Sequence, residues 1–262
     1  MADLIEPLAE LRAVIARLRA PDGCPWDREQ THASLAPAIL EEAYEVTAAI
    51  RAGDDQNLRE ELGDLLLVAF MHAQIAQEEG RFDLDDAVRD ATEKLIRRHP
   101  HVFAESEARD SGAVLRQWDA IKRAEKGNPD THYLADLPTH FPALMRAQKA
   151  QAKVARVNFD WHAVADVVAK VDEELAEVKK AMASGESAAV AEEIGDLLFA
   201  VTNLARKSKL DAETLLQAAT DKFIHRFHEL EDRVRESGKQ LGQLELRELD
   251  EIWNALKKTP SS

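Results

Sequence analysis

Along this chain, apolar residues recur at the three- and four-residue spacing of amphipathic helices, and no segment shows the strict alternation of a β-strand. The segment LLLVAFMHAQIA is hydrophobic on nearly all sides, so its helix is expected at the centre of a bundle. Aromatic residues make up only 5% of the chain, and Gly and Pro are scarce, which is typical of an all-helical protein. We predict helices over residues 4–19, 36–52, 57–77, 83–98, 115–126, 162–183, 188–208, 211–237 and 243–258.

A carboxylate pattern occurs twice, and each residue of the second copy lies 132 positions after its counterpart in the first. Both copies read EExxE and later EExGD, followed by an apolar run. Acids at i and i+3 share a helix face, so two such helices side by side would bring four carboxylates together. Their repulsion calls for a cation, and oxygen ligands favour Mg²⁺ or Mn²⁺. The copies are Glu41, Glu42, Glu45, Glu60, Glu61 and Asp64, and Glu173, Glu174, Glu177, Glu192, Glu193 and Asp196.

Two plainer interpretations of these acids stay open. A single EExxE segment is usually the solvated face of a helix, and a duplication can preserve a purely structural pattern. The repetition of all six positions favours the metal site over both. Gly63 and Gly195 also recur, and because glycine weakens a helix, we expect another helix or a ligand to approach closely there.

The net charge and the cysteine content indicate which kinds of partner and which cellular compartment to expect. The formal net charge of −15 argues against nucleic-acid binding, which needs a basic surface. The single Cys24 excludes an internal disulfide and a cysteine zinc site, and it fits a reducing cytoplasm. The first residues lack the apolar core of a signal peptide, and no run approaches the ~20 apolar residues of a membrane span. We therefore expect a cytoplasmic protein that binds neither nucleic acid nor membrane.

Basic side chains recur on one helix face in each half. Lys222 and Arg226 are four residues apart, as are Lys94 and Arg98. Taken alone, such a pair is most simply explained by salt bridges to nearby acids. Beside a metal-loaded acidic cluster, the same pair is also what a polyphosphate requires, because Arg offers a planar fork and Lys a point charge.

Tryptophan recurs as well, each time with a lysine four residues later. The pairs are Trp118 with Lys122, and Trp253 with Lys257. A core position and an aromatic lid over a base or ribose are equally good interpretations of Trp253. The sequence lacks GxxxxGK[ST], GxGxxG after a strand and GxSxG, which excludes P-loop, Rossmann and α/β-hydrolase sites. A di-iron bundle needs two Glu-x-x-His motifs, and only Glu29–His32 is present.

The chain resembles the MazG family of nucleoside triphosphate pyrophosphohydrolases in its two-copy form. The resemblance lies in GCPWDREQTHASLAPAILEEAYEV, LREELGDLLLVAF, EKLIRRHPHVF, NFDW, VDEELAEV, AEEIGDLLFAVTNLAR and DKFIHRF, within residues 11–258. It implies an all-α tandem repeat of two MazG-type helical bundle domains with four-helix-bundle-like cores, a homodimer, and magnesium-dependent hydrolysis of NTPs to NMP and pyrophosphate. We assign residues 1–127 to an N-terminal MazG-like domain, 128–138 to a linker and 139–262 to a C-terminal one.

The resemblance also assigns roles to individual residues. The family's metal ligands fall on Glu174, Glu177, Glu193 and Asp196, with counterparts Glu42, Glu45, Glu61 and Asp64 in the first copy. Its phosphate-contacting residues fall on Lys222 and Arg226, and a nucleotide-contacting tryptophan falls on Trp253. Apart from these family assignments, Glu173 and Glu192 are candidates for orienting water or for supporting the metal ligands, and Lys170 and Lys257 for binding substrate.

In similar two-copy proteins the C-terminal copy is usually regarded as the catalytic one, and extra polar groups favour it here as well. The second copy has Lys170, Asn203 and Arg206 where the first has Ala38, Met71 and Gln74. One departure weakens the match, because Ala189 stands where similar proteins can carry a basic residue.

We expect hydrolysis of many NTPs and dNTPs, because metal and basic residues do not read the base. Preferences of about ten-fold are expected, and a much larger preference would make Asn203 the first candidate for a base-reading group. The alternative is a regulatory nucleotide- or partner-binding helical module with little hydrolysis.

Overall fold

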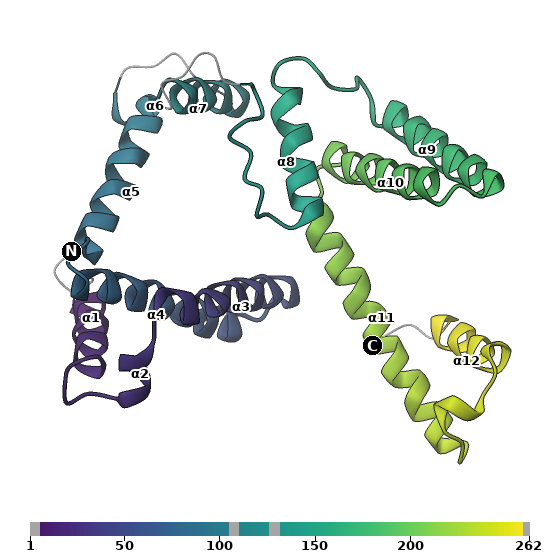
Figure 1. Cartoon of the computed structure of the whole chain (residues 1–262), viewed down its shortest axis with the longest axis horizontal. Coiled ribbons are helices and arrows are strands. Elements are labelled where there is room, and N and C mark those ends of the chain that lie inside the picture. The colour runs from purple at the N-terminus through teal and green to yellow at the C-terminus, as the bar shows by residue number, and fades with distance from the viewer. Residues whose placement is uncertain (1–5, 105–109, 126–131, 259–262) are drawn as a thin grey trace. The chain divides into compact units, whose positions relative to one another are not determined.

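The computed structural model describes residues 6–104, 110–125 and 132–258, and every regular element in these ranges is a helix (Figure 1). The predicted all-α class is therefore confirmed. Contacts divide the chain into two compact units, Met1–Gly127 and Asn128–Ser262, called unit 1 and unit 2 below. None of the helices in the described ranges is long and apolar enough to cross a membrane.

Unit 1 is built around a hairpin of two long helices, α3 and α4, which pack along each other (Figure 1). A capping box between Thr31 and Ser34 starts α3, and Gly53 ends it with a φ of 66°. Asp54 then caps the first turn of α4. The helices of unit 1 are α1 (Glu6–Leu18), α2 (Pro25–Glu29), α3 (His32–Ala52), α4 (Asp55–Glu78), α5 (Leu84–Arg98), α6 (Pro100–Phe103) and α7 (Ser111–Glu125).

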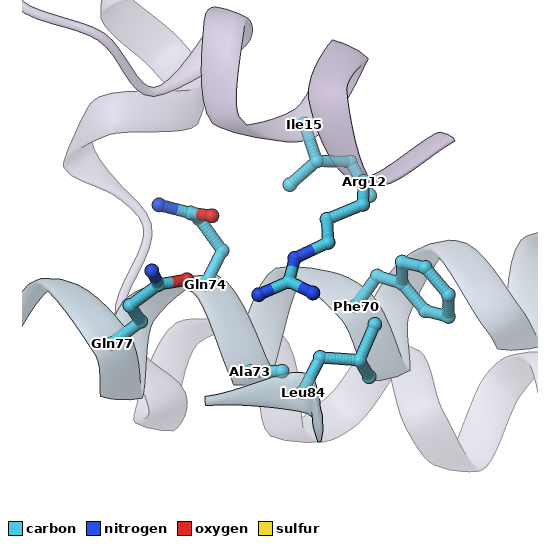
Figure 2. Close-up of a pocket in the computed structure, with 7 residues that line it drawn as sticks. All are labelled: Arg12, Ile15, Phe70, Ala73, Gln74, Gln77 and Leu84. Carbon is cyan, nitrogen blue, oxygen red and sulfur yellow. The ribbon is translucent and has the colours of Figure 1, made fainter. Parts of the chain in front are cut away.

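The core of unit 1 lies where α1 packs on α4. Ile15 of α1, which is 1% exposed, belongs to the same buried cluster as Phe70, Met71 and Ile75 of α4. Figure 2 shows Ile15 and Arg12 pointing from α1 toward the side chains of α4. The apolar segment that the sequence placed at the centre of a bundle thus supplies most of this core.

Unit 2 repeats the hairpin with α9 and α10, which are joined at Gly185 with a φ of 76° (Figure 1). α8 packs on α10 as α1 packs on α4, and α12 packs on α11 around Leu230, Val234 and Leu256. The elements of unit 2 are α8 (Ala143–Ala155), α9 (Val164–Ser184), α10 (Ser187–Lys207), α11 (Ala212–Glu236), the 3₁₀ helix Leu241–Gln243 and α12 (Leu246–Lys258).

The structure differs from the predicted helices mainly at α8, which the sequence analysis missed. The segment ALMRAQKAQAKVA carries few large apolar residues, so its periodicity is weak, although its alanines favour a helix. The short α2 was also missed. Of the predicted linker, residues 128–131 lie outside the described residues, and 132–138 form hydrogen-bonded turns before α8.

Candidate active site

The α9–α10 hairpin brings three of the four predicted metal ligands of unit 2 together. Glu174 and Glu177 of α9 and Glu193 of α10 each offer a carboxylate oxygen, and these oxygens lie within 4.8 Å of one another. Glu174 is only 6% exposed, although its side chain ends in a carboxyl group. A cluster of partly buried carboxylates at this spacing could hold a divalent cation.

Asp196, the fourth predicted ligand, does not contribute one of the three converging oxygens, but its charge acts on Glu193. Burial raises the pKa of Glu193, and the charges of Glu177, Asp196 and Glu174 raise it further. Asp196 lies three residues after Glu193, on the same side of α10. The repulsion expected from the sequence is therefore present in the folded chain.

Unit 1 has the same arrangement on α3 and α4. Oxygens of Glu42, Glu45 and Glu61 lie within 4.8 Å of one another. Burial raises the pKa of Glu42, and the charge of Asp64 adds to it. The pKa of Glu61 is raised by burial and by its neighbour Glu45. Both halves of the duplication thus form a carboxylate cluster, and the fourth acid stands beside it in each.

Lys170 distinguishes the two clusters. Its Nζ lies 2.5 Å from a carboxylate oxygen of Glu174 and 2.9 Å from one of Glu173. These two carboxylates, Glu174 first, raise the pKa of Lys170, so its ammonium stays charged. Ala38 occupies the corresponding position in unit 1. A positive charge therefore adjoins the carboxylate cluster of unit 2, where the sequence analysis expected a contact to substrate.

The predicted basic and aromatic residues of unit 2 meet around Trp253. Its ring lies 5.1 Å from that of Phe223, 5.5 Å from the guanidinium of Arg226 and 5.9 Å from Nζ of Lys257. Trp253 is half-buried against the α11–α12 core, so it combines a packing role with a cation–π role. Lys222 lies one turn before Arg226 and is exposed.

The basic and aromatic residues around Trp253 make no contact with the carboxylates of α9 and α10 in the described part of the chain. Among the described residues, no hydrogen bond, ion pair or ring contact links Lys222, Arg226, Trp253 or Lys257 to the acids of α9 and α10. A Cβ at Gly63 or Gly195 would meet nothing within 4 Å, so among the described residues no other helix makes the close approach that we expected there. The exposed Glu192 is likewise without an ion pair in the described part of the chain.

In unit 1 the corresponding arginine is already neutralised. The guanidinium of Arg98 lies 5.7 Å from the ring of Trp118 and 2.6 Å from a carboxylate oxygen of Glu125. Hydrogen bonds from Arg98 and Arg97 lower the pKa of Glu125 to about 2. In the sequence of unit 2, the position that corresponds to Glu125 is Pro260, because it lies 135 positions later, as Trp253 does after Trp118. For Arg226 the described residues offer no carboxylate partner.

Sequence analysis missed the buried Gln151 of unit 2 because it missed α8. Gln151 is 5% exposed and lines a cavity beside α10. A glutamine at a core position of an amphipathic helix was the available signal. It could be read only after α8 had been recognised.

The carboxylate clusters predict how stability depends on pH. Because the pKa values of Glu42, Glu61 and Glu193 are raised in the folded chain, these three carboxyls bind more protons in the native state than in the unfolded state above pH 4.5. The pKa of His72, which is lowered by burial, opposes them as a single group. We therefore expect the melting temperature in EDTA to rise as the pH is lowered from 7 toward 5. Calorimetry with and without 5 mM MgCl₂ tests this, since magnesium should stabilise most at pH 7. A melting temperature that falls steadily over this range in EDTA contradicts the prediction.

Comparison with known proteins gives the family. The family model described as the MazG nucleotide pyrophosphohydrolase domain matches residues 30–103 and 163–230, and these two segments contain the two carboxylate hairpins. The chain belongs to the MazG family. It is thus an enzyme with two copies of this domain, and the predicted tandem repeat is confirmed.

Relatives match almost the whole chain. It is 48% identical over 252 residues to the nucleoside triphosphate pyrophosphohydrolase of Escherichia coli strain K12, covering 95% of this chain and 96% of the relative. It is 43% identical over 248 residues to the nucleoside triphosphate pyrophosphohydrolase/pyrophosphatase MazG of Thermotoga maritima, covering 95% and 94%. A crystal structure of a mazG-related protein from Thermotoga maritima matches 44% of this MazG chain and 98% of that chain at 30% identity, with a TM-score of 0.39.

Proposed function

We propose that this MazG protein hydrolyses nucleoside triphosphates to nucleoside monophosphate and pyrophosphate, and that it accepts many NTPs and dNTPs. The observation that carries the proposal is the carboxylate cluster of Glu174, Glu177 and Glu193 in a chain of a nucleotide pyrophosphohydrolase family. The relatives' printed names support the same reaction.

Mg²⁺ is the proposed metal, with Mn²⁺ as a substitute, because the cluster consists of hard carboxylate oxygens alone. Glu174, Glu177 and Glu193 would hold it, with Asp196 beside them. The bound metal would neutralise charge on the triphosphate. The raised pKa of Glu193 fits this role, since a cation relieves the repulsion that raises it.

The side chains around the cluster supply the remaining steps. Glu192, or Glu173, orients a water molecule and takes its proton as the oxygen attacks the α-phosphorus. The bond from the α-phosphorus to its bridging oxygen breaks, and pyrophosphate leaves. Positive side chains then stabilise the charge on the leaving group. Lys222 and Arg226 are proposed for this role, with Lys170 and Lys257 as further substrate contacts and Trp253 against the nucleoside.

A homodimer would complete the site. Apolar side chains on the α9–α10 hairpin are unusually exposed, among them Leu175, Ile194 and Leu198 at 40–55%. A four-helix bundle made from two such hairpins would cover them, and a second chain offers a route by which basic residues reach the carboxylates. Light scattering that gives the mass of a single chain would contradict this part of the proposal. The lone free Cys24 fits a cytoplasmic protein.

A direct assay tests the proposed reaction. The full chain is incubated with a mixture of NTPs and dNTPs, with and without MgCl₂, and the products are separated. We expect NMP and pyrophosphate in equal amounts with magnesium, and neither in EDTA. Formation of NDP and phosphate would reject attack at the α-phosphorus. No turnover of any nucleotide would favour a regulatory nucleotide- or partner-binding module instead.

A further inference from the structure

The carboxylate cluster of unit 2 is in direct contact with a cation of the chain itself, Lys170. Its Nζ lies 2.5 Å from Oε1 of Glu174 and 2.9 Å from Oε1 of Glu173. The side chain of Glu174 is 8% exposed, whereas that of Glu173 is 58% exposed. Lys170 therefore joins a buried carboxylate inside the cluster to an exposed carboxylate at its edge.

Helix stability alone does not account for the contact between Lys170 and Glu174. The lysine precedes the glutamate by four residues on α9, and a pair in this order supports a helix less well than a pair in the reverse order. The contact matters more for the cluster, because Glu174 is buried and its carboxylate converges with those of Glu177 and Glu193. An ammonium beside it offsets a repulsion that solvent screens poorly.

Unit 1 has the same acids but lacks the lysine. Ala38 stands where unit 2 has Lys170, and Glu42 is the counterpart of Glu174. Glu42 is half-buried, whereas Glu174 is buried. The copy that buries this carboxylate more deeply is thus the copy that places a cation on it. The comparison indicates that Lys170 serves the carboxylate cluster of unit 2 and is not a general feature of the hairpin.

A metal ion at the cluster and the ammonium of Lys170 compete for Glu174. A carboxylate can bind a cation on each oxygen, but a divalent ion on one oxygen and an ammonium on the other would lie only about 5 Å apart. Their repulsion is strong in a partly buried site, where the effective dielectric constant is low. A divalent ion attracts three converging carboxylates at once, whereas the ammonium makes one bond to Glu174, so the metal displaces the ammonium.

Once it is displaced, the ammonium of Lys170 can move. The side chain is 32% exposed, and its flexible stem of four carbons can carry the charge to a new partner. Glu173 stays within reach, but an exposed ion pair is weak, so a phosphate group can replace it. Lys170 is therefore available to a triphosphate after a metal ion has bound to Glu174, and much less so before.

We propose that Lys170 couples metal binding to nucleotide binding: it holds Glu174 as an internal counter-ion, a divalent metal displaces it, and the released ammonium then binds the phosphates. The inference rests on the proposed function and adds a regulation of the same site. Metal and nucleotide each bind more tightly in the presence of the other, in part through Lys170. A lysine that contacted phosphate permanently would contribute equally with and without metal.

The first experiment measures metal binding without nucleotide. Mn²⁺ is titrated by calorimetry into the full chain carrying Glu61→Gln, called the parent, in which the cluster of unit 1 is disabled. We expect Lys170→Met to bind Mn²⁺ more tightly than the parent by about five-fold or more, because the competing ammonium is gone. Lys179→Met is the matched control: it removes the same charge from an exposed position on α9, and the affinity should change less than two-fold. Unchanged or weaker binding by Lys170→Met overturns the proposal.

The second experiment measures nucleotide binding with and without metal. The probe is ATP with a methylene bridge between the α- and β-phosphates, which resists the proposed cleavage. We expect Lys170→Met to weaken its binding by about five-fold or more in MgCl₂. In EDTA the loss should be less than two-fold, because Glu174 holds the ammonium of the parent. An equal loss in both conditions would make Lys170 a permanent phosphate contact, and no loss in either would make it a structural ion pair; both results overturn the coupling.

The third experiment transfers the lysine to unit 1. In a chain with Glu193→Gln, which disables the cluster of unit 2, Ala38→Lys should bind Mn²⁺ more weakly than Ala38→Met by about three-fold or more. The methionine is of similar length but uncharged, and melting curves confirm that all variants fold. Equal affinities would overturn the proposal. Absence of Mn²⁺ binding by the parent overturns the proposed metal site and the coupling together, whereas equal Mn²⁺ binding by the parent and Lys170→Met overturns the coupling alone.

Discussion

Substitution of Glu193 by Gln should abolish pyrophosphate release, with kcat/KM lower by a factor of about 10³ or more. The amide keeps the size and shape of the side chain but removes the negative charge at the centre of the cluster. Glu193 is the residue of α10 whose oxygen lies within 4.8 Å of those of both Glu174 and Glu177 on α9. Its replacement therefore removes the one carboxylate of α10 that converges with those of α9, and leaves Glu174 and Glu177 with Asp196 beside them.

The same variant makes a second, independent prediction. Without metal, Glu193→Gln should be at least as stable as the wild type, because it relieves the repulsion that raises the pKa of this group. Added magnesium should raise its melting temperature less than that of the wild type. Asp172→Asn is the matched control: Asp172 is exposed on α9 and lies about 200° around the helix from Glu174. Equal turnover by Glu193→Gln and wild type would contradict the ligand assignment.

Most of the fold could be predicted because the long helices carry strong local signals. The hairpin of α9 and α10 shows apolar residues at helical spacing and a Gly at the break, and Gly185 indeed ends α9 in the left-handed region. The start of α3 was predicted less accurately. The sequence favoured a start near Ala36, one residue before Pro37, but the capping box at Thr31 starts the helix earlier and tolerates the proline inside it.

The carboxylate clusters were predictable because helical spacing and duplication fix which acids share a face. What could not be predicted is pairing between side chains that are far apart in the sequence. Lys170 pairs with Glu174 and Glu173 at the i+4 and i+3 spacing of one helix, but the bond from Arg98 to Glu125 joins residues 27 positions apart. The cavity beside Gln151 was missed for another reason, since weak apolar periodicity hid the helix that carries it.

Substitution of Arg226 by Ala should lower kcat/KM by about 10² or more, with much of the loss in kcat. In the proposed reaction, negative charge develops on the departing pyrophosphate, so a cation that meets it acts most strongly in the transition state. Arg226 is suited to this because it lies 5.5 Å from Trp253 and the described part of the chain gives it no carboxylate partner. Its guanidinium remains available to a phosphate.

Arg98→Ala is the matched control in unit 1, and its expected effect is on stability. Arg98 has the same cation–π contact, at 5.7 Å from Trp118, but it is paired with Glu125. Its loss lets the pKa of Glu125 rise from about 2 toward its usual value. In the wild type that ion pair is present at pH 7 and is lost as the pH falls through the pKa of the folded carboxyl. The melting temperature of Arg98→Ala at pH 7 should therefore be lower than that of the wild type, while its turnover changes less than two-fold. Equal losses of turnover in the two variants would mean that both copies of the MazG domain hydrolyse nucleotides, and that the neutralised arginine of unit 1 is released when substrate binds.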